Sequence, residues 1–334
     1  MIKNFKNLNI FYSYETIQKP WGGANTFLNY LYKSIERKKG IKLIPINDFK
    51  ENKKGVFFFN QLGTGPKNKS RKFNKEELNF FIKSRNKLIV RAVNLHGNYR
   101  RKCKIPFLTK EWGSDKLTIY LCNNADHVIF QSKYQLKVFK KFGFKGNSFS
   151  IINNASTICD YINFDHNEFI SNNDLKESNL NLISSAFSTQ PFKRFDLIAK
   201  FSKIKNVNID HFGNWPKHVD PCEVKIRNTV SHKELVFEIL KRDFLLHPAE
   251  KDMCPNSVIE ALSIGVPVIY WKNGSSAEIV NENGIEMNVK KMEETVDIAI
   301  KRKKILRDNL EINKFNYRIE KATSKYLNVF ENYR

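Results

Sequence analysis

Short apolar runs alternate with amphipathic stretches along the chain. The short runs are rich in Val, Ile, Leu and Phe and have the length of buried strands, whereas the longer stretches repeat apolar residues every three or four positions, as helices do. Within 24–35, for example, Phe27, Leu31 and Ile35 fall on one helical face. The predicted strands are 8–12, 56–59, 88–93, 125–131, 148–152, 180–185, 207–212, 244–247 and 266–271. The predicted helices are 24–35, 75–84, 133–141, 195–202, 232–240, 257–262, 290–307 and 315–333.

This alternation predicts an α/β fold in which helices cover both faces of parallel sheets. The chain has 334 residues, which exceeds the size at which a single hydrophobic core stops growing. We therefore predict two doubly wound, Rossmann-like domains, 1–165 and 180–314, followed by a last helix in 315–334. The polar, Asn-rich stretch 166–179 is the predicted linker.

Three carboxylates lie in the predicted strand–helix–strand unit at 244–271 and in the loop after it. Asp252 and Glu260 lie eight positions apart across the start of the helix, which Pro255 is predicted to open, and Glu278 follows the second strand. Ligands of such units bind at the carboxyl ends of the strands. An ionised carboxylate accepts two O–H donors, as the vicinal hydroxyls of a sugar or a ribose require. The alternative is that these acids only complement helix dipoles.

A Gly/Ser loop precedes Glu278. Gly274, Ser275 and Ser276 carry backbone N–H groups of the kind that bind a diphosphate. The unit therefore combines sites for sugar hydroxyls and for phosphate, which is the chemistry of a nucleotide sugar.

The same segment resembles the retaining glycosyltransferases of the two-Rossmann-domain (GT-B) fold, group-4 type, also called the glycosyl transferases group 1 family. Their signature is two Glu residues separated by seven positions and an EAL-x-x-G-x-P-V-I run. The chain matches the run at Glu260-Ala261-Leu262, Gly265, Pro267, Val268 and Ile269. The first carboxylate is Asp252, one methylene shorter than Glu, and Glu250 is a candidate to replace it.

Other matches follow in the order of the family. They are Gly22 and Gly23 after the first strand, His96 at a strand end, Lys193, and Gly213 in a turn after a strand. The arginine that the family often places a few residues before Lys193 is missing, and Arg194 is the candidate to compensate.

The resemblance implies two domains facing across a cleft, with the last helix packed back on the first domain. It also implies a catalytic role for Asp252, His96 and Glu250 at the donor sugar. Lys193, Arg194 and the Gly274–Ser276 loop are expected at the diphosphate, Glu260 at the ribose, and Gly213 near the base or a phosphate. Gly22 and Gly23 let backbone N–H groups approach the donor phosphate or the acceptor.

The activity implied is transfer of a hexose, with retention, from a UDP- or GDP-sugar to a hydroxyl of a glycan or a lipid-linked acceptor. The resemblance also implies that no metal is required, and the sequence is consistent with this, since the chain has neither a D-x-D motif nor a His/Cys cluster with ligand spacing. No tightly bound cofactor is expected. Two alternatives remain open: a glycosyltransferase acting on DNA or an anionic lipid-linked acceptor, and a non-catalytic nucleotide-sugar-binding homologue, which the Asp252 and arginine departures favour. A nucleotide-sugar epimerase of the same fold is a third.

Charge and cysteine content bear on partners and location. The net charge is +23, and the densest basic runs, 67–72 and 99–102, lie in the first half. This charge indicates an anionic membrane surface as a partner, with nucleic acid less favoured, or it reflects only a Lys- and Asn-rich composition. Five scattered cysteines without a C-x-x-C pair, no long apolar run and no signal-peptide pattern predict a cytoplasmic protein, with peripheral attachment to the inner face of a membrane as an option.

Overall fold

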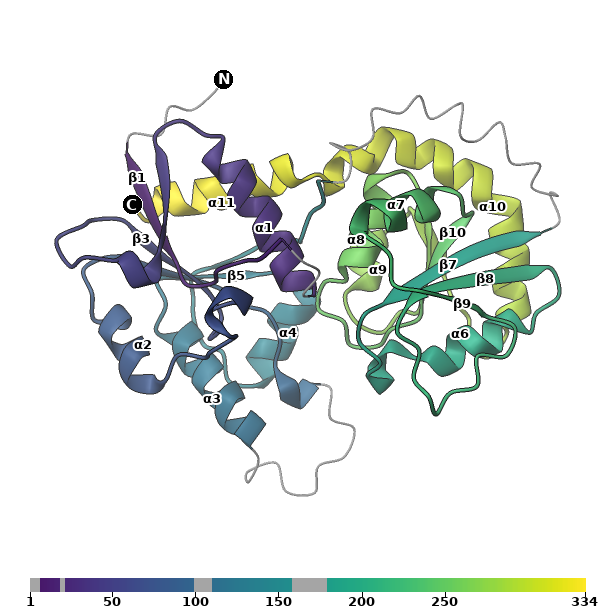
Figure 1. The fold of residues 1–334 in the computed structure, drawn as a ribbon, viewed down its shortest axis with the longest axis horizontal. Coiled ribbons are helices and arrows are strands. Elements are labelled where there is room, and N and C mark those ends of the chain that lie inside the picture. The colour runs from purple at the N-terminus through teal and green to yellow at the C-terminus, as the bar shows by residue number, and fades with distance from the viewer. Residues whose placement is uncertain (1–6, 19–21, 99–109, 158–178) are drawn as a thin grey trace. The chain divides into compact units, whose positions relative to one another are not determined.

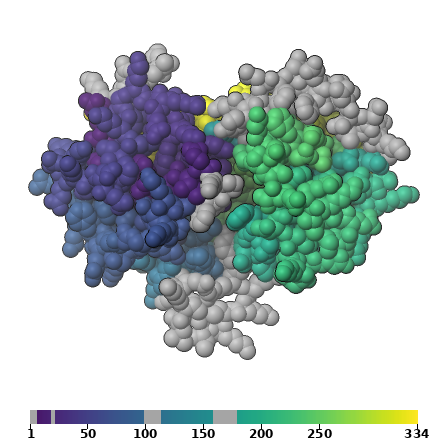
Figure 2. Space-filling view, in the orientation of Figure 1, coloured from purple at the N-terminus to yellow at the C-terminus, as the bar shows by residue number. Residues whose placement is uncertain are grey.

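The computed structural model describes residues 7–18, 22–98, 110–157 and 179–334. Two compact units divide the chain: Met1–Asn154 together with Ile319–Arg334, and Ala155–Arg318. Each unit contains a six-stranded parallel sheet with helices packed against it (Figure 1). The space-filling view shows each unit as a body of closely packed atoms (Figure 2). The predicted α/β class with two doubly wound sheets is confirmed. The predicted linker 166–179 lies, except for its last residue, outside the described residues.

The sheet of the first unit has the order β2-β1-β3-β4-β5-β6. Its strands are β1 (Leu8–Tyr12), β2 (Ile41–Pro45), β3 (Val56–Asn60), β4 (Lys87–Arg91), β5 (His127–Phe130) and β6 (Phe149–Ile151). The helices of the unit are α1 (Gly23–Glu36), α2 (Lys75–Ile82), α3 (Lys110–Asn123), α4 (Lys133–Lys141) and α11 (Ile319–Asn332), with short 3-10 turns η1 (Ile46–Asp48), η2 (Pro66–Asn68) and η3 (His96–Asn98). All five residues of β3 are buried, as expected for a central parallel strand covered on both faces.

The sheet of the second unit has the order β12-β11-β10-β7-β8-β9. Its strands are β7 (Leu180–Ala186), β8 (Val207–Gly213), β9 (Lys225–Arg227), β10 (Phe244–His247), β11 (Val268–Tyr270) and β12 (Gly284–Glu286). The helices are α6 (Phe195–Ser202), α7 (His232–Leu240), α8 (Asn256–Ser263), α9 (Ser276–Val280) and α10 (Met292–Asn313), with 3-10 turns η6 (Pro191–Lys193) and η7 (Lys314–Tyr317). The strand order reverses between β7 and β10, and ligands of such sheets bind outside the carboxyl ends of the strands at this point.

Strand β10 shows how the alternation of side chains builds two cores in the second unit. Leu245 packs in the cluster that contains the apolar residues of α7 and α8, such as Val236 and Ile259. Phe244 and Leu246 pack in the cluster on the other face, with residues of α6 and α10. Because successive strand residues point to opposite faces, a four-residue apolar strand is enough to join both cores.

The C-terminal helix α11 belongs to the first unit, where its apolar face is buried. The Tyr326 ring lies 5.9 Å from that of Phe27 in α1, and the Phe330 ring lies 5.1 Å from that of Phe58 in β3. Tyr326 and Phe330 are both fully buried. This aromatic contact ties residues from the two ends of the chain into one core.

Several element predictions require correction. Pro255 precedes helix α8 in an extended conformation (ψ 118°), so the helix begins at Asn256. The last predicted helix is interrupted at Arg318, whose extended backbone (ψ 149°) separates η7 from α11. Ser276, predicted in a loop, opens the short helix α9. Strands β2, β9 and β12 and helices α3 and α9 were not predicted. All three strands lie at sheet edges, where an apolar run is not required, and β9 and β12 have only three residues each.

Candidate functional site

Two loops of the second unit meet at the point where the strand order reverses. Lys193 lies in η6 after β7, Asp252 lies in the loop after β10, and their Nζ and Oδ2 atoms are 3.1 Å apart. The backbone N–H of Glu250 donates to the carbonyl of Phe192 at 2.8 Å, which joins the same two loops through the main chain. The fold thus brings together Lys193, Glu250 and Asp252, which sequence analysis had singled out separately.

The loop after β11 joins this arrangement through its backbone. Asp252 and Gly274 form an isolated parallel bridge, and the Ser275 N–H donates to the Asp252 carbonyl at 2.9 Å. Gly274 has φ +126°, and a Cβ there would lie 2.8 Å from the Asp252 nitrogen, so only glycine fits. The carboxyl ends of β7, β10 and β11 therefore contribute to one site.

Three buried polar side chains at this site have no hydrogen-bond partner within the described part of the chain. They are His247, through Nε2, and the hydroxyls of Ser275 and Ser276. Ser275 and Ser276 are fully buried, and His247 is only 6% exposed. Because buried polar groups are nearly always hydrogen-bonded, such a cluster calls for an explanation, and a bound ligand is one.

Sequence analysis did not single out His247. Burial lowers the pKa of His247 to about 4, and the charges of Asp252 and Lys193 act on it in opposite directions. The imidazole is therefore neutral at pH 7 and lies beside the Lys193–Asp252 pair. Its position as the last residue of an apolar strand was the available signal, because side chains at strand ends face the ligand edge of the sheet.

Asp252 is an ionised carboxylate in this environment. Burial raises its pKa, but the charge and hydrogen bond of Lys193 outweigh this effect and hold the pKa below its ordinary value. The N–H of Cys254 also donates to the Asp252 Oδ1 at 3.3 Å. The carboxylate is thus held in place by one cation and one backbone donor.

Glu260 lies on helix α8 and has a partner of its own. Its Oε1 is 3.1 Å from Nε2 of His232, the first residue of α7. Burial lowers the pKa of His232, but the hydrogen bond and charge of Glu260 outweigh it, so the pKa is raised. Sequence analysis did not identify His232.

Arg194 forms an ion pair with a neighbouring carboxylate. Its guanidinium makes a two-point contact with Asp196, at 2.8 and 2.7 Å, and lies 4.8 Å from the centre of the Trp271 ring. Its backbone is left-handed (φ +57°) and caps α6. In this structure Arg194 therefore shapes the start of α6, and Lys193 is the cation that meets Asp252.

Gly213 and Glu278 occupy other positions in the second unit. Gly213 ends β8 with φ +116°, and a Cβ there would lie 2.3 Å from the carbonyl oxygen of Ala186, so its backbone alone explains the glycine. Glu278 is an exposed residue of α9 whose N–H donates to the Ser275 carbonyl at 3.1 Å.

The predicted site residues of the first unit lie at its carboxyl strand ends. Gly22, with φ +100°, precedes α1, and Gly23 is the first residue of that helix; both are exposed. His96 opens η3 and is exposed, and its backbone N–H donates to the buried carboxylate of Asp115 at 2.9 Å. The first unit therefore contains a helix that begins at a glycine and a histidine whose backbone is held by Asp115.

A buried cation that sequence analysis missed also lies at this end of the first sheet. Arg91, the last residue of β4, is 1% exposed. Its guanidinium donates to the side-chain oxygens of Asn60, Gln131 and Asn154 at 2.6, 2.9 and 2.6 Å. These partners are neutral amides, so they satisfy hydrogen bonds without cancelling the positive charge.

Over 7–18, 22–98, 110–157 and 179–334, no three His, Cys, Asp or Glu side chains gather as a metal site. In the same described stretches, no helix is long and apolar enough to cross a membrane.

No protein-family model matches the chain, and no curated protein matches it. Solved structures match it over nearly its full length. Sucrose-phosphate synthase from Thermosynechococcus elongatus gives a TM-score of 0.69 at 10% identity, covering 97% of this chain and 98% of that chain. The chain has the GT-B fold. HepE of Anabaena in complex with UDP-glucose gives 0.66 at 14% identity (97% and 100% covered), and WaaG, a glycosyltransferase involved in lipopolysaccharide biosynthesis, gives 0.65 at 13% (97% and 99%). At these identities the GT-B likeness establishes the fold.

Proposed function

We propose that the protein is a retaining glycosyltransferase that moves a hexose from a nucleoside-diphosphate sugar to a hydroxyl acceptor. The observation that carries this proposal is the Lys193–Asp252 pair at the reversal point of the second sheet, beside buried hydroxyls and an imidazole without partners. The GT-B fold supports it, since HepE, a structure of this fold, is described with UDP-glucose bound.

In the proposed complex the donor separates the resting ion pair. Lys193 moves to the diphosphate, which also receives the N–H groups of the Gly274–Ser276 loop and the hydroxyls of Ser275 and Ser276. Asp252, with Glu250 beside it, then accepts from the hydroxyls of the donor sugar. Glu260 accepts from the ribose.

We propose roles for the other predicted residues of each unit as well. Arg194 and Glu278 support the diphosphate loops, and Gly213 lets the backbone approach the nucleotide. On the first unit, His96, Gly22 and Gly23 serve the sugar and the acceptor.

The proposed reaction breaks the bond between the anomeric carbon and the diphosphate oxygen and forms a bond from the acceptor oxygen on the same face. The acceptor proton passes to the leaving phosphate oxygen, so charge and atoms balance. The barrier lies in the negative charge that develops on the diphosphate, which Lys193 and the loop N–H groups stabilise electrostatically. We propose that these groups do this work without a metal.

A nucleotide screen tests this proposal. Because a ligand that binds only the folded state stabilises it by mass action, a nucleotide at one hundred times its Kd adds about 2.7 kcal/mol. We expect UDP or GDP to raise the melting temperature of the wild type, in a thermal-shift series with UDP, GDP, ADP, CMP and TDP. The Glu260→Gln variant should lose most of the shift. If none of the five nucleotides stabilises the wild type, the donor site is wrong.

The two unpartnered hydroxyls allow a sharper prediction. Ser275→Ala and Ser276→Ala each remove a buried hydroxyl that has no partner in the unliganded fold, so unfolding free energy should stay the same or rise by up to about 1 kcal/mol. Nucleotide affinity should fall, because a phosphate oxygen of the proposed donor then loses a hydroxyl that donates to it. Urea unfolding and calorimetric titration measure the two effects, and a loss of stability without a loss of affinity contradicts the assignment.

The charge distribution favours an anionic acceptor, and we propose a glycan or lipid-linked acceptor that carries phosphate or carboxylate. The first unit has 34 Lys and Arg against 11 Asp and Glu, whereas the second has 23 of each, so the whole excess of +23 lies in the first unit. The buried Arg91 adds to this positive field. A lipid-linked acceptor also fits a cytoplasmic enzyme at a membrane surface. Nucleic acid is the alternative, and binding of a random DNA duplex at physiological salt would favour it.

A further inference from the structure

The contact between His232 and Glu260 joins two helices of the second unit. Nε2 of His232 lies 3.1 Å from Oε1 of Glu260, and the two side chains are 29% and 11% exposed. Within the described residues, this is the polar contact that the Glu260 side chain makes. One carboxylate oxygen is therefore engaged, and Oε2 remains for a ligand.

The start of α7 is held firmly, which places His232 at a defined point. Ser231 caps the helix by accepting from the Glu234 N–H at 3.3 Å, and the Glu234 carboxylate accepts from the Ser231 N–H at 2.8 Å. This reciprocal pair satisfies two N–H groups that a helix start otherwise leaves free. The loop 228–231 thus ends at a fixed position next to His232.

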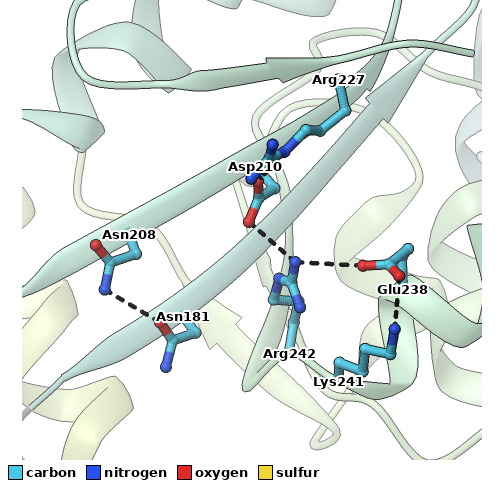
Figure 3. A network of polar contacts seen from close by, with 7 residues as sticks. All are labelled: Asn181, Asn208, Asp210, Arg227, Glu238, Lys241 and Arg242. Carbon is cyan, nitrogen blue, oxygen red and sulfur yellow. Dashed lines mark hydrogen bonds and ion pairs between the residues drawn. The ribbon is translucent and has the colours of Figure 1, made fainter.

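The far end of α7 is anchored by ion pairs (Figure 3). Arg242, just after the helix, donates to Asp210 of β8 at 2.9 Å and to Glu238 of α7 at 3.4 Å. Arg227 of β9 also donates to Asp210, at 2.6 Å. The helix is therefore tied to the sheet at one end while its other end presents His232.

Apolar packing fixes α7 against α8 between these two ends. Val236 and Ile239 of α7 share a buried cluster with Ile259 and Leu262 of α8. His232, Val236 and Ile239 follow at helical spacing, so all three lie on the face of α7 that meets α8. The separation of His232 and Glu260 is thus set by a packed interface.

We propose that His232 is a positioning residue that holds the Glu260 carboxylate in the orientation that accepts from the ribose of the donor. This rests on the proposed role of Glu260 as the ribose ligand. A Glu side chain has three rotatable bonds, and the imidazole removes the freedom of the last one by engaging Oε1. The carboxylate then presents Oε2 to the nucleotide without a reorientation on binding, which reduces the entropy lost in binding.

The test compares ribose-containing and ribose-deficient nucleotides. The variants are His232→Leu, which removes the donor, and His232→Gln, which keeps an N–H donor; His218→Leu, at an exposed position in the same unit, is the control. The probes are UDP and GDP and their 2′,3′-dideoxy forms, measured by calorimetric titration. We expect His232→Leu to weaken the better of UDP and GDP about tenfold, as loss of a charge-assisted hydrogen bond implies. His232→Gln should recover part of this affinity, and His218→Leu should match the wild type.

The dideoxy probes decide whether His232 acts through the ribose. Each dideoxy nucleotide should bind the wild type more weakly than its parent nucleotide does. Its affinity for His232→Leu should equal its affinity for the wild type, since no ribose hydroxyl is left to position. In transfer assays, KM for the donor should rise and kcat should change by less than about twofold.

Two results overturn the inference. Equal weakening of parent and dideoxy nucleotides by His232→Leu means that the residue supports the fold of the pocket. Unchanged affinity in His232→Leu means that Glu260 needs no positioning. Either result leaves the proposed function standing, whereas failure of UDP and GDP to bind the wild type removes the inference and the proposed donor site together.

Discussion

Lys193→Met is expected to lower kcat about a hundred- to a thousandfold while the protein remains folded. In the proposed mechanism Lys193 is the cation that stabilises the leaving diphosphate, and removing one preorganised electrostatic contact of this kind typically costs two to three orders of magnitude in rate. The measurement is steady-state transfer with whichever UDP- or GDP-sugar the nucleotide screen selects. Lys193→Arg keeps the charge and should retain much more activity.

The same substitution also has a cost in stability, because it removes the cation at 3.1 Å from the Asp252 carboxylate. We expect a loss of about 1 to 3 kcal/mol in unfolding free energy, as for a buried charge left without its partner. The double variant Lys193→Met/Asp252→Asn should recover part of this stability, since a neutral amide replaces the unpaired carboxylate, and should recover none of the activity. Stability then recovers while activity does not, which a purely structural ion pair cannot explain.

Lys200→Met is the matched control for Lys193→Met. Lys200 is an exposed residue of α6, the helix that follows the 3-10 turn containing Lys193. Its loss should leave activity and stability within about 0.5 kcal/mol of the wild type. If Lys193→Met is as active as Lys200→Met, Lys193 does not stabilise the leaving group.

Lowering the pH from 7 to 5 is expected to destabilise the fold by about 4 kcal/mol through two buried histidines. The pKa of His211 and that of His247 are each lowered from 6.5 to about 4, in both cases mainly by burial. Between these values the unfolded chain binds protons that the folded chain does not, so stability is complete above pH 6.5 and falls as the pH drops towards 4. Each histidine contributes about 2 kcal/mol between pH 7 and pH 5.

His211→Gln isolates one of the two contributions. His211 is fully buried, with Nδ1 2.8 Å from the Ser184 hydroxyl and Nε2 3.2 Å from the Asn214 carbonyl oxygen. The variant should be less stable at pH 7 but should lose about 2 kcal/mol less than the wild type on going to pH 5. Urea unfolding at the two pH values measures the difference. His218→Gln, at an exposed position, should show the wild-type difference. An identical pH dependence in His211→Gln would mean that folding does not shift the pKa of His211.

The elements whose bounds were predicted well have a continuous apolar run or a clear helical periodicity. Strands β1 and β10 and helices α4 and α7 have the bounds expected from their apolar runs and periodicity. A central parallel strand must be apolar on both faces, so its length can be read from the chain. The edge strand β9 is entirely exposed, and no apolar run is required there.

The candidate site likewise combines local features that the sequence predicts with contacts that only the fold creates. The spacing of Asp252 and Glu260 within one strand–helix unit, and the loop at Gly274, are local features of the sequence that any packing of the unit keeps together. The ion pair of Lys193 with Asp252 joins residues 59 positions apart, and the contact of His232 with Glu260 joins residues 28 apart. Which loops meet depends on the strand order.

The sequence by itself therefore determined the two α/β halves and part of the proposed donor site, because burial and local spacing can be read along the chain. Tertiary structure alone decided which charges neutralise each other, which buried groups have no partner and that Arg91 sits among amides. These depend on the order β12-β11-β10-β7-β8-β9 in one sheet and β2-β1-β3-β4-β5-β6 in the other. That order sets which strand ends lie side by side, and a polar side chain at a strand end acquires its partners only from the neighbouring strands and helices.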